Sequence, residues 1–284
     1  MQEIIINSMP DCLNFKQSGR SKQKEGHIMR KSKVLKILRE GGCALSTQVG
    51  TGNELLAGMA AKIGFDCLWL DTEHKCMSDK QVYDCIQAAA LSDTDCVVRI
   101  KKSGYYSYFR PLEDGAAGIM VPHCFNSDDA KLAVRNARFY PLGLRGVDFS
   151  GPGSDYMLTP SNECSEFLNN ENFVMLQIED KEAIDNIDKI LDVDGIDLLF
   201  VGPADLTQSL AHYGLKGKDA FMTAIKKVAD AVAKRENRWW GIPAGNVEQA
   251  KMYIDMGARF INLKGDLSLV LNGWKQLHND FRAL

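Results

Sequence analysis

The chain has 284 residues, of which 45% are hydrophobic and 25% are charged, and its formal net charge is −3 at pH 7. These proportions are close to the averages for soluble globular proteins, and the small negative charge gives no electrostatic reason to expect a nucleic acid or an anionic membrane as a partner. No apolar run approaches the roughly 20 residues that a membrane span needs, so no membrane-embedded segment is expected either.

Residues 1–28 differ in character from the rest of the chain. They lack a clear periodicity, and the segment SGRSKQKEG is polar and typical of a loop. The charged start, apolar middle and cleavage site of a secretory signal are missing. We therefore expect a poorly ordered extension over residues 1–28, followed by a folded domain that begins near Met29.

From Met29 onward, short apolar runs alternate with longer segments of helical periodicity. The apolar runs are residues 43–49, 67–71, 96–100, 118–122, 173–179, 197–203, 239–244 and 259–264. The helical segments are residues 53–64, 79–91, 106–116, 127–139, 181–193, 219–235, 246–258 and 268–281. Several helical segments open on Asn, Ser or Asp, as N-caps do, and several end on Gly just before the next apolar run.

Eight such units predict the α/β class and a single (β/α)8 TIM barrel over residues 29–284. Strands with near-continuous apolar sequence are buried on both faces, and eight parallel strands are the number that closes a barrel. An open doubly wound sheet would be expected to carry a Gly-rich nucleotide turn after the first strand, where GTGNE is only a partial match. Two longer connections, 140–170 and 204–218, are expected to be functional loops.

The eight cysteines are scattered, with no C-x-x-C pair and no metal-knuckle spacing. Several lie within or beside apolar runs, where cysteine usually acts as a small hydrophobic residue. We therefore expect a reduced, cytoplasmic protein.

Barrel enzymes place their chemistry at the carboxyl ends of the strands. This rule gathers polar residues from several of the predicted strands onto one rim. In chain order these are Asp71, Glu73, His74, Arg99, His123, Gln177, Glu179, Gly202, Pro203, Ala204, Asp205 and Lys264.

The crowded carboxylates of this rim predict a divalent cation, because isolated carboxylates so close together would repel one another and take up protons. Oxygen ligands without Cys or His suit Mg²⁺ or Mn²⁺. Glu179 and Asp205 follow adjacent strands and can reach one ion, while water and substrate oxygens fill its other positions. The alternative is that each carboxylate merely caps the next helix.

Three more side chains of the rim have both a structural and a functional interpretation. Arg99 lies in an apolar strand, where it either forms a structural ion pair or donates to the carboxylate and developing oxyanion of an oxo acid. His74, beside two carboxylates, is either a surface residue or a general base. Lys264 is either a Schiff-base nucleophile or a solvated lysine, and we favour the latter because a metal site makes an imine unnecessary.

Five segments in order resemble the motifs of one family, the 4-hydroxy-2-oxoheptanedioate aldolase/citrate lyase family, whose members include 2-keto-3-deoxy-L-rhamnonate aldolase and macrophomate synthase. The segments are WLDTEHKCMS, VVRIK, GIMVPHCFNSDDAKLAVRNARFYPLGLRG, LQIEDKEAIDNIDKIL and LFVGPADLT. The likeness runs from about residue 30 to the C-terminus. It implies a class II, pyruvate-specific aldolase on a barrel of the phosphoenolpyruvate/pyruvate-binding superfamily.

By position, the resemblance implies that Glu179 and Asp205 are the metal ligands. Arg99 would bind pyruvate and stabilise its enolate, and Gln177 would help to hold either pyruvate or a metal-bound water. After Gly202 and Pro203, the amides of Ala204 and Asp205 would bind the pyruvate carboxylate. The same role is expected from the residues alone, because free N–H groups at the start of a helix bind anions.

The resemblance also implies that His74 is the catalytic base, acting through water, and that an acidic residue of a neighbouring subunit, here Glu113, orients it. Family members are typically hexamers with active sites at subunit contacts, often with exchanged C-terminal helices. We therefore expect a homo-hexamer or another homo-oligomer. Thr72, the Thr47-Gln48 end of the first strand and Lys264 depart from the usual motifs, all on the aldehyde side of the pocket.

The predicted reaction is the reversible cleavage of a 4-hydroxy-2-oxo acid to pyruvate and an aldehyde through a metal-stabilised enolate. The expected cofactor is a divalent cation, Mg²⁺, Mn²⁺ or Co²⁺, and the expected partner is a small 2-oxo acid. Two alternatives stay open: a related decarboxylase or condensing enzyme that acts on oxaloacetate-like substrates, and a non-catalytic metabolite-binding barrel that keeps the metal site.

Overall fold

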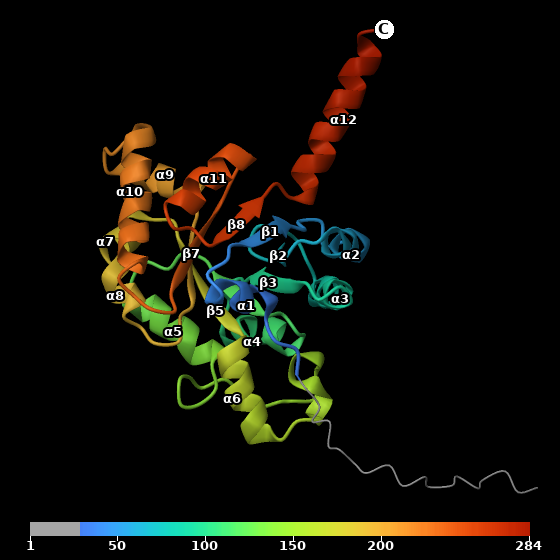
Figure 1. Ribbon diagram of the computed structural model, residues 1–284, viewed down its shortest axis with the longest axis vertical. Helices are drawn as coiled ribbons and strands as arrows, with labels where there is room; N and C mark the ends of the chain where they lie inside the picture. Colours follow the sequence, from blue (N-terminus) through green and yellow to red (C-terminus); the bar gives the residue numbers. More distant parts are fainter. Residues whose placement is uncertain (1–28) are drawn as a thin grey trace, which may run out of the picture.

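The computed structural model describes residues 29–284, and they contain a closed barrel of eight parallel strands in the order β1 to β8 (Figure 1). The strands are β1 (Ala44–Gln48), β2 (Cys67–Asp71), β3 (Asp95–Arg99), β4 (Gly118–Val121), β5 (Phe173–Ile178), β6 (Leu198–Val201), β7 (Trp239–Pro243) and β8 (Phe260–Leu263). The (β/α)8 barrel predicted from the sequence is therefore confirmed. The extension expected over residues 1–28 lies outside the described residues.

Each of the eight apolar runs forms a strand, because the sheet is buried on both faces. Every residue of β2 and of β3 is buried. The register of this pair sets Asp71 opposite Arg99 at the carboxyl end. On the far side of the barrel, the pairing of β5 with β6 sets Ile178 opposite Val201, so Glu179 and Gly202 follow the two strands at the same level.

Helices alternate with the strands around the barrel. They are α1 (Lys33–Arg39), α2 (Glu54–Ile63), α3 (Asp79–Ala90), α4 (Tyr105–Glu113), α5 (Ser127–Ala137), α6 (Ser161–Glu171), α7 (Lys181–Asp185), α8 (Ile187–Leu191), α9 (Pro203–His212), α10 (Gly217–Val232), α11 (Val247–Asp255) and α12 (Asp266–Arg282). Asn53, Asn126 and Asn246 cap α2, α5 and α11 through their side chains, and Ser78 forms a capping box at α3. Asn53 and Asn246 opened predicted helical segments, whereas Ser78 and Asn126 lie one residue before the segments predicted to open at Asp79 and Ser127.

The helix α1, the helix α6 and a short 3-10 helix were not predicted, α9 was expected only as a helical start at Asp205, and one predicted helix is broken. The connection 140–170, expected to be a loop, contains α6 and a short 3-10 helix (Pro152–Met157). The connection 204–218 contains most of α9, and residues before the first strand form α1. The helical pattern over 181–193 is interrupted at Asn186, which separates α7 from α8. These short helices depend on tertiary packing more than on their own periodicity.

Two of the three buried hydrophobic clusters belong to the barrel itself. The larger cluster lies between the outer faces of the strands and the surrounding helices. The smaller fills the barrel lumen with large side chains such as Trp69, Phe173, Phe200 and Phe260. Val34, Leu35 and Leu38 of α1 belong to this inner cluster, together with the first residues of several strands. Helix α1 thus closes the amino end of the barrel and leaves the carboxyl end as the open one.

The last helix, α12, differs from all the others because it projects away from the barrel at the end of the chain (Figure 1). None of its residues is buried. Its exposed apolar residues are Leu267, Leu269, Val270, Leu271, Trp274, Leu277 and Phe281. Among residues 29–284, no helix is long and apolar enough to cross a membrane.

Candidate active site

A cavity of about 690 Å³ lies at the carboxyl end of the barrel. Its walls come from the ends of β1, β2, β3, β5, β6, β7 and β8 and from the helices α9, α10 and α11. Of the residues predicted for the site, it is lined by His74, Arg99, Gln177, Gly202, Pro203, Ala204, Asp205 and Lys264. The strand-end rule therefore placed these residues around one cavity, as expected for a barrel.

A buried ion pair joins β2 and β3 at the floor of this cavity. The Arg99 Nε and Nη2 atoms donate to the Asp71 carboxylate at 3.0 and 2.6 Å. Burial opposes the charged form of Asp71, but the hydrogen bonds and charge of Arg99 outweigh it and hold the pKa of this carboxyl below its ordinary value. The third guanidinium nitrogen, Nη1, points to the Gln177 side-chain oxygen at 3.4 Å. Arg99 thus makes the structural ion pair and also faces the cavity.

Trp69 supports this arginine from inside the barrel. The Arg99 Cζ atom lies 4.9 Å from the centre of the Trp69 ring, a distance suited to a cation–π contact. The buried Trp69 indole nitrogen has no hydrogen-bond partner within residues 29–284, although the ring lines the cavity. The guanidinium plane is therefore held from two directions, by a carboxylate and by an aromatic face.

Glu179 follows β5 and is buried. Its Oε1 atom accepts a hydrogen bond from the His123 backbone amide at 2.8 Å, and its Oε2 atom accepts one from the Gln177 side chain. Burial raises the pKa of Glu179; His123 opposes this, and the negative charges of Asp205 and Glu73 add to it. The positive charge around Glu179 therefore does not offset its burial and the two neighbouring carboxylates.

Asp205 lies in the first turn of α9. Gly202 caps this helix and offers no side chain to the first amides, while Pro203 occupies the first turn. The helix thus presents free N–H groups at the cavity, the arrangement that binds anions at helix N-termini. A Cβ atom at Gly202 would lie 2.6 Å from Glu179 Oε2, so only glycine lets this backbone approach the glutamate so closely.

The donor set at this edge fits a divalent cation such as Mg²⁺. In the described part of the chain, no three His, Cys, Asp or Glu side chains converge as a complete metal site. Glu179 and Asp205 provide hard oxygens, and their mutual repulsion is one reason why the pKa of Glu179 is raised. Mg²⁺ is commonly held by one or two carboxylates, with water and substrate oxygens as further ligands.

His74 and Glu73 follow β2 in a loop held by Asp71, whose Oδ1 atom accepts hydrogen bonds from both backbone amides. The His74 side chain is exposed, and its Nε2 atom lies 3.7 Å from Glu73 Oε2. The same oxygen lies 3.2 Å from Arg99 Nε. The imidazole therefore lies at the open edge of the cavity, where its ring is accessible to a bound molecule.

Glu113, the last residue of α4, does not line this cavity. Its carboxylate lies 3.5 Å from Arg110, and no ion pair or hydrogen bond joins it to His74 within residues 29–284. Burial raises the pKa of Glu113, and the charges of Arg145 and Arg110 oppose the shift. A role beside the base would need a second copy of the chain.

Sequence reasoning placed His123 on the rim but gave it no role. The structure gives this residue a left-handed backbone (φ 49°) and sets its ring between two carboxylates. The signals in the sequence were its position just after β4 and Pro122, and its place in one of the segments that resemble the family motifs.

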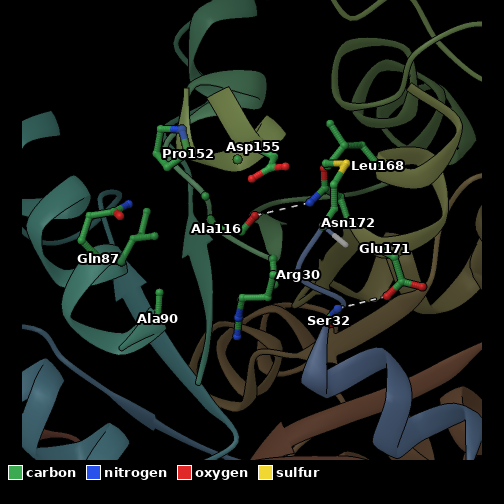
Figure 2. A pocket seen from close by; sticks show the side chains of 15 residues that line it. Arg30, Ser32, Gln87, Ala90, Ala116, Pro152, Asp155, Leu168, Glu171 and Asn172 are labelled. Atoms are coloured by element: carbon green, nitrogen blue, oxygen red, sulfur yellow. Dashed lines mark hydrogen bonds between the residues drawn. The ribbon is translucent and has the colours of Figure 1, made fainter. Parts of the chain in front are cut away.

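A second cavity, of about 140 Å³, lies at the opposite end of the barrel (Figure 2). Asn172 donates to the Ala116 carbonyl, and the Ser32 amide donates to Glu171. Ala116 and Asn172 lie just before the amino ends of β4 and β5, where barrel residues serve stability rather than catalysis. The carboxyl-end cavity is therefore the candidate active site.

Three comparisons with known proteins agree with one another. The model of the HpcH/HpaI aldolase/citrate lyase family matches residues 49–273. A 4-hydroxy-2-oxo-heptane-1,7-dioate aldolase of Salmonella arizonae is 32% identical over 249 residues, which cover 87% of this chain and 93% of that protein. The crystal structure of an HpcH/HpaI aldolase from Desulfitobacterium hafniense aligns with a TM-score of 0.81 at 26% identity, over 88% of this chain and 96% of that one. A family protein from Burkholderia cenocepacia aligns at 0.78 and 29% identity, over 88% and 99%.

Proposed function

The chain belongs to the HpcH/HpaI aldolase/citrate lyase family and is a lyase, and on this premise we propose that it is a class II aldolase that depends on a divalent cation. The proposed reaction is the reversible cleavage of a 4-hydroxy-2-oxo acid to pyruvate and an aldehyde. One observation supports it above the others: Arg99, Asp205 and the N-terminus of α9 line the same cavity, and the carboxylate of Glu179 lies beside Gly202 at its edge. A 2-oxo acid needs a partner for each of its two charged or polarised ends, and this set provides both.

Glu179 and Asp205 would hold the cation. When bound there, Mg²⁺, Mn²⁺ or Co²⁺ would act as a Lewis acid toward the 2-oxo and carboxylate oxygens of the substrate.

The pyruvate half would be bound by groups that are already in place. The substrate carboxylate would accept hydrogen bonds from the amides of Ala204 and Asp205, which the Gly202-Pro203 turn leaves free. Arg99 would place its positive charge at the oxygen that becomes negative when the enolate forms, and Gln177 would hold the same end of the substrate. Because Asp71 and Trp69 already hold the guanidinium, little reorganisation accompanies the reaction.

His74 would remove the proton of the 4-hydroxyl group, through a water molecule, as the bond between C3 and C4 breaks. Its exposed ring stands on the cavity wall beside Glu73. Glu113 of a neighbouring subunit would orient this ring. Within residues 29–284 of one chain, Glu113 makes no ion pair or hydrogen bond with His74, so this contact would require a second copy.

We also propose that the protein is a homo-oligomer, a hexamer in the first instance, located in the cytoplasm. The apolar side chains of α12 recur at helical spacing and are all exposed in the single chain. Contiguous exposed apolar surface of this kind is typical of protein–protein contacts. The seven cysteines among residues 29–284 are all free thiols, which suits a reducing compartment.

Pyruvate release from a panel of 4-hydroxy-2-oxo acids, with oxaloacetate included, tests the proposal in the presence of each of the three cations. We expect cleavage that EDTA abolishes and that Glu179→Gln and Asp205→Asn both reduce at least a hundredfold. The matched control is Glu182→Gln, which replaces an exposed carboxylate in the first turn of α7 and should leave turnover unchanged. Full turnover by EDTA-treated protein would contradict the metal-dependent reaction, and release of CO₂ from oxaloacetate alone would favour a decarboxylase.

A further inference from the structure

His123 occupies an unusual backbone position at the edge of the candidate site. It follows β4 and Pro122 and adopts a left-handed conformation, which is uncommon for a residue with a side chain. Two hydrogen bonds hold this conformation: its amide donates to Glu179 Oε1 at 2.8 Å, and its carbonyl accepts from Lys102 Nζ at 2.9 Å. Such conformations persist only where the surroundings fix them, and they gather at functional sites.

The ring of His123 lies between two carboxylates that come from different strands. Its Nδ1 atom is 3.3 Å from Glu179 Oε1, and its Nε2 atom is 3.3 Å from Glu73 Oε1. The ring is also stacked on Phe125, with centroids 6.1 Å apart. Both edges of the imidazole are thus engaged, and the ring spans the space between the end of β5 and the loop after β2.

The remaining oxygens of the two carboxylates face different parts of the site. Glu179 Oε2 accepts from Gln177 and lies beside Gly202, which lines the cavity. Glu73 Oε2 lies 3.2 Å from Arg99 Nε and 3.7 Å from His74 Nε2. Within residues 29–284, His123 is therefore the side chain that contacts both carboxylates directly, while Gln177 and Arg99 connect them by a longer route.

We propose that His123 is a positioning residue for the cation ligand Glu179. It holds Oε1 with both its amide and its ring, so that Oε2 stays on the side of Gly202 and the cavity. Through its other edge it keeps Glu73 against Arg99 and His74. This inference rests on the proposed function, because it assigns Glu179 to the cation.

Neighbours that orient a metal ligand typically change metal affinity ten- to hundredfold when they are removed. We expect a loss in this range for His123→Gly and His123→Asn. Both replacement residues tolerate a left-handed backbone, and both keep the amide that donates to Glu179. The variants therefore remove the ring without forcing the chain into a new path.

The experiment measures the dissociation constant of Mn²⁺ by titration calorimetry, without substrate, on the full-length protein. The matched control is His212→Asn, which replaces an exposed histidine at the far end of α9 and should leave the constant within twofold of wild type. In parallel, exchange of the pyruvate methyl protons in D₂O reports on enolisation at saturating Mg²⁺.

The outcomes separate this inference from the proposed function. If wild-type protein neither binds Mn²⁺ nor enolises pyruvate, the proposed function is wrong. If wild type does both, and the two His123 variants bind Mn²⁺ as tightly as wild type or more tightly, the positioning role is wrong. Loss of the folded barrel in both variants, measured by circular dichroism, would also overturn it, because the ring would then stabilise the strand ends rather than orient a ligand.

Discussion

Replacing Arg99 by methionine should both destabilise the barrel and stop enolisation of pyruvate. The variant keeps most of the side-chain volume but leaves Asp71 buried without its partner. Removing one partner of a buried ion pair costs about 3–5 kcal/mol. Asp71 still accepts the amides of Glu73 and His74, so part of its charge remains compensated and we expect the lower end, about 3 kcal/mol. Urea unfolding at a fixed protomer concentration, followed by tryptophan fluorescence, measures this change.

The double variant Arg99→Met with Asp71→Leu separates stability from catalysis. Replacing a buried pair by apolar side chains is often neutral or stabilising, so most of the lost stability should return. Enolisation of pyruvate should not return, because the Arg99 guanidinium, which would face the enolate oxygen, is still absent. As a control, Arg235→Met breaks ion pairs with the exposed Asp188 and Asp192 and should cost no more than about 1 kcal/mol. If Arg99→Met unfolds at the same urea concentration as wild type, Arg99 does not compensate the free-energy cost of burying the Asp71 carboxylate.

Acid should weaken this pair in a defined pH range. Arg99 holds the pKa of Asp71 below its ordinary value, although burial opposes the shift. The folded state therefore gains stability from the ionised pair at pH values above about 4, the ordinary Asp pKa. That contribution disappears as the pH falls through the lowered pKa. A urea midpoint that stays constant between neutral pH and that range, and then falls, is the expected profile.

Three further predictions concern the cavity. Gly202→Ala would place a Cβ atom 2.6 Å from Glu179 Oε2, and we expect a loss of roughly 1–3 kcal/mol in stability and about a hundredfold in turnover, measured by unfolding and by pyruvate release. Borohydride reduction in the presence of pyruvate should leave no adduct on Lys264 by mass spectrometry, and Lys264→Met should still enolise pyruvate; a reduced imine would contradict the metal-dependent mechanism. Mixing inactive His74→Ala and Glu113→Ala proteins should restore activity in part if the two residues act across subunits, whereas no recovery after subunit exchange would place Glu113 outside the site.

The strands could be predicted from the sequence because each is an apolar run buried on both faces, and because Asn, Ser and Gly mark the helix ends between them. The short helices could not. Val34, Leu35 and Leu38 form α1 because they pack into the amino end of the barrel, which no local pattern announces. The segment that holds α6 contains Pro and Gly at several positions and was therefore expected to be a loop.

The sequence predicts which residues surround the cavity but not which of them contact one another. The strand-end rule gathers Arg99, Gln177 and Asp205 around one cavity because parallel strands end at the same level. Which carboxylate pairs with Arg99 depends on the register of β2 and β3. The position of His123 between two carboxylates accompanies a positive φ angle that histidine adopts only occasionally, and Glu113 lies in α4 beside Arg110, with no contact to His74 within residues 29–284.

The charge distribution of the site would make the binding of the proposed cation and of the proposed substrate depend on each other. On the side of β2 and β3, Asp71 is neutralised by Arg99 through two hydrogen bonds of 3.0 and 2.6 Å, so no cation is required for this carboxylate. On the side of β5 and β6, the negative charge of Asp205 contributes to the raised pKa of Glu179, and the nearest histidine compensates only in part. A divalent cation bound at this second edge would neutralise the two carboxylates and leave positions open for anionic oxygens. A 2-oxo acid placed between the edges would then meet the cation on one side and the guanidinium on the other, which directs the developing negative charge to the oxygen that both can reach.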